Sequence, residues 1–236
     1  MVREIHARLL ERLADIKLPA NAAVLHLEPA PEAHAEAAWG HVVRIPAVAP
    51  ESQDAVVISL LPSAVADVPR LLHNAVGLLK PDGVLLASLL GRDSFPEWQQ
   101  AWAAAGSAAA HVGPFPTLQT AAGLLQKLQL ALPVADRDVM ELTCPSMERM
   151  VAQLRAHGVA NSHPARNQGL ITPRQWAQME MAYRAQFGRP DGRLPVTLEI
   201  LYLHAFKPGP GQPVSARRGS GTVSLVRILG DSTKGC

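Results

Sequence analysis

The sequence predicts an α/β protein built on an open, mostly parallel β-sheet with helices on both of its faces. Three short apolar runs, at residues 22–27, 54–60 and 84–90, read as buried strands. Strands covered on both faces show such continuous runs, because neither side of the strand meets water. Segments with helical periodicity separate the runs, and strands that alternate with helices are typical of a parallel sheet.

Further elements are predicted in the first half of the chain. Apolar residues recur at helical spacing in residues 3–16 and 65–79, so each of these segments is expected to form an amphipathic helix. Residues 31–39 predict a short helix, and residues 41–45 predict a second short strand. The Lys-Pro-Asp-Gly sequence at residues 80–83 is expected to form a turn after the second amphipathic helix.

Polar residues mark the predicted helix starts in the second half. Asp93 or Ser94 is expected to cap one helix and Thr117 another, because their side chains can accept the first free backbone N–H groups. The strongest local signal is a capping box, in which Thr172 is followed by a proline and then by Gln175 three residues after the cap.

The domain organisation is predicted to be simple. Residues 132–142 and 194–206 are expected to be extended and to complete one domain over residues 1–206, which is less regular from about residue 107 onward. Residues 207–236 are rich in Gly, Pro and Arg and are expected to form a separate, irregular C-terminal segment.

Composition excludes several classes of function. The net charge of +2 and the absence of a basic stripe argue against nucleic-acid binding. Two cysteines cannot form a disulfide framework, so a cytoplasmic protein is expected. No apolar run reaches the ~18 residues of a membrane span. The nine histidines show no metal-ligand spacing, so no metal site is predicted.

Several ordered motifs carry a family resemblance. Residues 54–59, 79–84 and 88–91 follow a pattern that resembles the class I S-adenosylmethionine-dependent methyltransferases. The C-terminal half is similar to one branch of that family, which contains the mitochondrial complex I assembly factor, an arginine hydroxylase, and the malonyl-carrier-protein O-methyltransferase of biotin synthesis. The segments that carry this second resemblance are 111–115, 123–125, 132–136, 154–161, 191–197 and 218–224.

The resemblance implies a fold, a cofactor and a type of partner. The implied fold is a class I methyltransferase-like three-layer α/β sandwich, here with a shortened sheet. The implied cofactor is S-adenosylmethionine and the implied activity is methyl transfer. The implied partner is a protein substrate or a respiratory-complex subunit, which leaves contact with a membrane surface as an alternative to a purely cytoplasmic location.

The departures from the family pattern fall on the expected cofactor site. Family members have an aspartate and glycines in and after the first strand, where this chain has His26 and then Glu28-Pro29-Ala30-Pro31. Prolines fix φ and remove N–H donors, so the turn loses the close backbone approach that glycines allow. Residues 28–46 are also too short to hold the family's second strand, whose terminal acid normally bonds the ribose. Weak or absent cofactor binding is therefore expected.

Five residues are the candidates for functional contacts. Glu28 could replace the lost ribose-binding acid, although a solvated loop residue is the simpler interpretation. Ser59 and Leu60 stand at the carboxyl end of a central strand, where open α/β sheets bind ligands, but packing would also explain them. Arg217 and Arg218 are candidates for a partner contact, with a solvated surface as the simpler alternative.

Three functions remain open at this point. The first is a methyltransferase-family protein with a degraded cofactor motif. The second is a non-catalytic assembly or binding protein that uses the sheet as a scaffold. The third is a protein-arginine hydroxylase.

Overall fold

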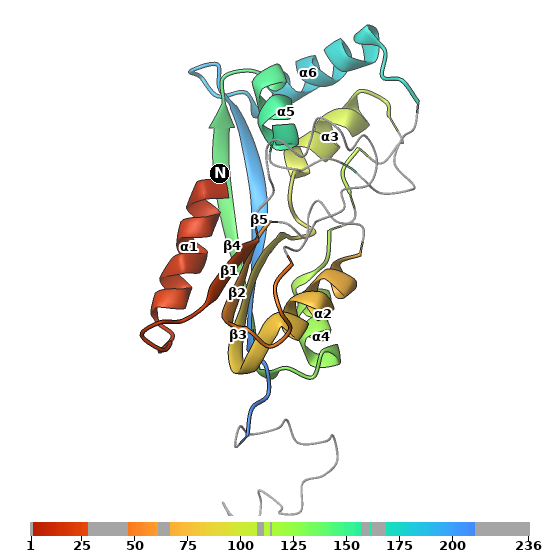
Figure 1. Ribbon diagram of the computed structural model, residues 1–236. Helices are drawn as coiled ribbons and strands as arrows, with labels where there is room; N and C mark the ends of the chain where they lie inside the picture. Colours follow the sequence, from red (N-terminus) through yellow and green to blue (C-terminus); the bar gives the residue numbers. More distant parts are fainter. Residues whose placement is uncertain are drawn as a thin grey trace, which may run out of the picture.

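A computed structural model describes residues 2–27, 47–60, 67–107, 111–113, 115–156, 161 and 169–210 (Figure 1). Within these residues, one five-stranded sheet has the strand order β1-β2-β3-β5-β4. The strands are β1 (Val24–Leu27), β2 (Gln53–Ser59), β3 (Leu79–Leu90), β4 (Ala131–Cys144) and β5 (Leu194–Phe206). The helices are α1 (Val2–Ala14), α2 (Val68–Leu78), α3 (Pro96–Ala104), α4 (Leu118–Lys127), α5 (Met147–Ala156) and α6 (Pro173–Phe187).

The sheet is mostly parallel, as predicted. β1, β2 and β3 are parallel neighbours, whereas β5 is antiparallel to both β3 and β4. β4 therefore runs in the same direction as β3, one position further along the sheet. When the chain passes from β3 to β4, it leaves a place between these two strands, and the last strand, β5, fills that place.

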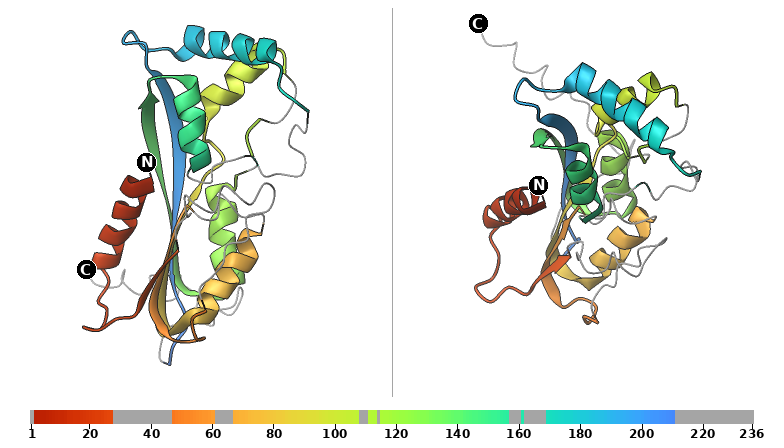
Figure 2. Two further views of the ribbon diagram at one scale, coloured as in Figure 1. Left: turned by 45° about the horizontal axis from the view of Figure 1, so that its top comes forward. Right: turned by 90° about the horizontal axis from the view of Figure 1, so that it is seen from above.

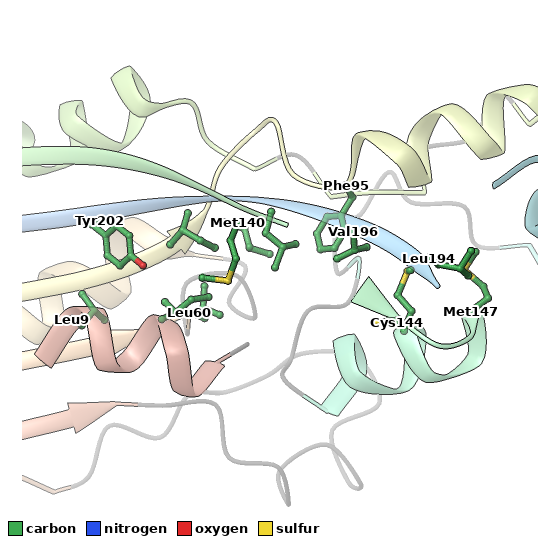
Figure 3. Packing of buried hydrophobic residues seen from close by; sticks show 14 of the residues in the cluster. Leu9, Leu60, Phe95, Met140, Cys144, Met147, Leu194, Val196 and Tyr202 are labelled. Carbon is green, nitrogen blue, oxygen red and sulfur yellow. The ribbon is translucent and has the colours of Figure 1, made fainter. Parts of the chain in front are cut away.

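Helices cover both faces of the sheet, which confirms the three-layer architecture (Figure 2). Alternate residues of β2 enter two different cores: Ala55 and Val57 pack with α1, and Val56 and Ile58 pack with α2 and α4. The core on the α1 side continues along β5 to α3, α5 and α6. Figure 3 shows this continuity, from Leu9 of α1 to Met147 of α5.

Most local predictions within the described residues are confirmed. Thr172 and Gln175 form the reciprocal capping box of α6, and the Thr117 side chain caps α4. The last strand, β5, spans the predicted residues. The helix expected at 31–39, the strand expected at 41–45 and most of the segment 207–236 lie outside the described residues.

Two local predictions are wrong. Residues 80–83 do not separate a helix from a strand but form an irregular part of β3, with Asp82 in the left-handed region at a φ of 65°. Neither Asp93 nor Ser94 caps α3; its first cap residue is Phe95, which makes no side-chain capping bond. The reason is a competing contact, because the Ser94 hydroxyl bonds the backbone N–H and C=O of Glu199 in β5.

Both tyrosines of the chain are buried, and this leads to a prediction about alkaline pH. Burial raises the pKa of Tyr183 and of Tyr202 above the usual value of about 10, although Arg8 and Arg12 oppose the shift at Tyr202. The folded chain thus keeps protons that the unfolded chain loses. The tyrosine contribution to the free energy of unfolding is complete below pH ~10 and is lost as the pH rises further.

We expect phenolate absorbance in an alkaline titration to appear together with the loss of circular dichroism. A phenol that ionises near pH ~10 while the dichroism is unchanged would contradict the burial of these rings.

Candidate functional site

The parallel strands β1, β2 and β3 end at one edge of the sheet. Their pairing places Leu27 beside Ile58, and Ser59 beside Ser88. We call His26, Leu27, Ser59, Leu60 and Ser88 together the carboxyl edge. Ligands of open α/β sheets bind outside the carboxyl ends of such strands, so a binding site is expected here.

Ser59 is anchored to the N-terminal helix. Its Oγ lies 2.7 Å from Nδ1 of His6 in α1, and the His6 ring lies 5.4 Å from the ring of His26. Ser59 itself is completely buried. Sequence reasoning selected Ser59 but missed His6, because the helical spacing of this segment concerns only its apolar residues.

Leu60 turns the chain sharply at the end of β2. It is buried and has a φ of 49°, a left-handed conformation that is uncommon for a leucine. The backbone N–H of Leu60 donates to the Ser88 hydroxyl at 3.0 Å, which holds the bend against β3. Ser88 was not among the predicted site residues, although residues 88–91 belong to the family-like pattern and could have indicated it.

The structure brings only part of the predicted set together. Ser59 and Leu60 lie at the carboxyl edge, and both are buried and hydrogen-bonded within the protein. Glu28, Arg217 and Arg218 lie outside the described residues, so their roles stay predictions. Glu28 directly follows Leu27, the last residue of β1.

Two buried carboxylates fasten the loop after β3 to β5. Glu199 accepts a hydrogen bond from the Asp93 backbone N–H at 2.8 Å and lies 3.5 Å from Arg137. Glu97, in the first turn of α3, accepts from both the backbone N–H and the hydroxyl of Thr197. These bonds fix the path of residues 91–97 as the chain leaves β3.

Three tryptophans of the described residues form a cluster in the core. Trp98, Trp102 and Trp176 contact one another edge-on, and His111 stacks on Trp102 with 3.8 Å between the ring centroids. Burial lowers the pKa of His111, whose Nε2 lies 2.7 Å from the Ser107 hydroxyl. Trp102 is almost completely buried.

The described part of the chain contains no group of three His, Cys, Asp or Glu side chains arranged to hold a metal ion. No helix within it is both long and apolar enough to cross a membrane. The thiol of Cys144 is buried, and burial raises its pKa, which leaves it protonated at neutral pH.

Comparison with known proteins gives relatives of two kinds. No protein-family model matches the chain. A malonyl-[acyl-carrier protein] O-methyltransferase from Halorhodospira halophila is 31% identical over 64% of this chain and 50% of its own length. The human mitochondrial arginine-hydroxylase NDUFAF5 is 30% identical over 74% of this chain and 52% of its own length. The chain thus spans about half the length of the curated relatives it matches.

The fold comparison agrees with the sequence comparison. The crystal structure of the Bacillus YcgJ protein matches with a TM-score of 0.50 at 12% identity, over 86% of this chain and 99% of the YcgJ chain. A structure described as a putative methyltransferase from Bacillus halodurans matches equally well. The described residues have the fold of the class I methyltransferases. The chain belongs to the class I S-adenosylmethionine-dependent methyltransferase family.

Proposed function

We propose that the chain binds S-adenosylmethionine at the carboxyl edge, with low affinity. The observation that carries the proposal is that three parallel strands end side by side there, with Ser59 and Ser88 at the same level of neighbouring strands. This is the position at which open α/β sheets accept nucleotide-like ligands. Family membership supports the choice of ligand.

The residues of the carboxyl edge fit the cofactor only in part. Hydroxyl and imidazole groups can bond a nucleoside, but the hydroxyls of Ser59 and Ser88 already have protein partners. None of the five edge residues carries a carboxylate, the group that the family resemblance implies for the ribose. Glu28 follows β1 directly in the sequence and is our candidate for that contact. Low affinity follows from this incomplete set of ligand groups.

A transferred methyl group would come from the cofactor, so the role of the protein would be to hold donor and acceptor in line. The close pair of His6 and Ser59 resembles a base and a nucleophile only in its distance. Ser59 is completely buried and cannot reach a substrate, which makes the pair a structural contact.

Calorimetric titration with S-adenosylmethionine tests the proposal. Loss of the ribose-binding acid and of the glycine turn removes several hydrogen bonds, each worth about 0.5–1.5 kcal/mol. Because ~1.4 kcal/mol changes a dissociation constant tenfold, we expect a value between about 100 μM and a few mM. A dissociation constant at or below ~10 μM would show that the site is intact, and no binding at several mM would remove the cofactor from the proposal.

A non-catalytic assembly role is the second candidate. It is favoured by the position of the departures, which precede Pro62, whereas the family-like segments of the C-terminal half run from 111 to 224. The partner would then be a protein, such as a respiratory-complex subunit, in the cytoplasm or at a membrane surface, and Arg217 and Arg218 would contribute charge to the contact. The third candidate is arginine hydroxylation, the activity given in the name of the human relative. Absence of cofactor binding in the titration would favour the second candidate over the first.

A further inference from the structure

Helix α1 is attached to the edge strand of the sheet by two ion pairs. Arg8 pairs with Asp138, and Arg12 pairs with Asp136 at 2.9 Å. Both aspartates belong to β4, which lies at the end of the strand order, and β4 is separated from α1 by more than a hundred residues of sequence. Arg12 also lies over the ring of Tyr202 in β5, with 4.0 Å from the guanidinium carbon to the ring centroid.

The described apolar contacts of α1 form a single stripe along the helix, which Ile16 and Leu18 continue after its end. Ile5 and Leu9 are completely buried against the sheet, and Leu13 packs partly against the same core. Figure 1 shows α1 on its own side of the sheet, away from the other helices. Because Leu13 is only partly buried, charged contacts add to the attachment at this end of the helix, and charge is sensitive to salt.

The same helix touches the carboxyl edge. His6 lies between Ile5 and the arginines in the sequence, and its Nδ1 contacts the hydroxyl of Ser59 at the end of β2. Ser59 is in turn next to Leu60, whose left-handed bend is held by Ser88. A movement of α1 away from the sheet would therefore remove a polar contact at the place where we propose that the cofactor binds.

We propose that α1 is a strap, held on the sheet by the pairs Arg8–Asp138 and Arg12–Asp136, whose docking completes the carboxyl edge through His6. The two ion pairs set how often α1 leaves the sheet. A ligand binds at the carboxyl edge only while α1 is docked. The coupling to a ligand rests on the proposed function, whereas the attachment of the strap does not.

Hydrogen–deuterium exchange of the full chain, followed by mass spectrometry, tests the attachment, because exchange reports local opening. We expect the Asp136→Asn/Asp138→Asn variant to speed exchange in α1 between about twofold and thirtyfold, the range for the loss of two partly exposed ion pairs. Exchange in β2 and β3 should be unchanged. Raising the salt concentration from about 0.05 M to about 1 M should raise the exchange rate of α1 in the wild type towards its rate in the variant, because screening weakens both ion pairs.

The matched control is Glu141→Gln, which removes an ion pair of the same strand, β4, whose other partner, Arg189, lies outside α1. This variant should leave exchange in α1 as it is in wild type. Equal exchange of α1 in the wild type and the double variant would overturn the proposal. So would a rise shared by α1, β2 and β3, since that would be global unfolding rather than release of the strap.

The coupling has its own readout. At a concentration of S-adenosylmethionine ten times its measured dissociation constant, exchange in wild-type α1 should slow about elevenfold, while exchange that follows other openings should slow less. If calorimetry shows binding and α1 is not slowed, the coupling is wrong. If calorimetry shows no binding, the proposed function fails, and the salt and variant experiments still decide whether α1 is a strap.

Discussion

Replacement of Trp102 by alanine is expected to lower the free energy of unfolding by about 3–5 kcal/mol. The indole is almost completely buried and touches Trp98, Trp176 and the stacked ring of His111. Its removal would leave a cavity where α3 meets α6, and close-packed neighbours refill such a space only in part. Urea denaturation followed by far-ultraviolet circular dichroism measures the change.

Two variants give this measurement its controls. Trp102→Phe keeps a ring and removes an indole N–H that has no hydrogen-bond partner in the described part of the chain, so its cost should be clearly smaller. Met181→Ala changes an exposed side chain of the same helix pair and should alter stability by less than ~0.5 kcal/mol. A loss below ~1 kcal/mol for Trp102→Ala would mean that the cluster is not part of the core.

Replacement of Gly91 by alanine is expected to cost about 2–4 kcal/mol. A Cβ at this position would overlap the carboxylate of Glu199, with Oε2 and Cδ as its nearest atoms. The Glu199 carboxylate is buried and bonded to the Asp93 N–H, so it cannot move aside without losing that contact and its proximity to Arg137. The loop that leaves β3 towards α3 would be displaced with it.

Gly123→Ala is the matched control for this prediction. Gly123 lies inside α4, and nothing stands within 4 Å of a Cβ placed there. The alanine should therefore raise the free energy of unfolding by about 0.5–1 kcal/mol, because glycine weakens helix interiors. Chemical denaturation of the two variants side by side should give changes of opposite sign. A neutral Gly91→Ala variant would show that Glu199 can move without cost.

These two predictions concern the framework that carries the carboxyl edge. Gly91 follows β3 directly, and β3 contributes Ser88 to the edge. Trp102 lies further away, in the part of the α1-side core that α3, α5 and α6 build around β5. Cofactor affinity should thus respond more strongly to Gly91→Ala than to Trp102→Ala in protein that is still folded.

The candidate site was only partly predictable from the sequence. Ser59 and Leu60 could be selected because a continuous apolar run announces a buried strand, and the carboxyl end of such a strand is where ligands bind. The His6 contact could not be found in the same way, because His6 and Ser59 are 53 positions apart. Nothing near either residue in the sequence indicates that they meet.

Local signals determined the elements of this protein. The apolar runs of β2 and β5, the helical spacing in α1 and the capping box at Thr172 depend on residues within a few positions of one another. Such short-range patterns act through the periodicity of strands and helices and through backbone N–H groups at helix ends, so they can be read before the chain is folded.

The tertiary structure alone decided how these elements meet. It placed β5 antiparallel between β3 and β4. It also led the Ser94 hydroxyl to hydrogen-bond the backbone of Glu199, 105 positions away, instead of capping α3. It also brought Arg8 to Asp138 across 130 positions. Contacts of this kind depend on strand order and on which face of the sheet each helix covers. Those choices are settled by the burial of the whole core, which no short segment of sequence contains.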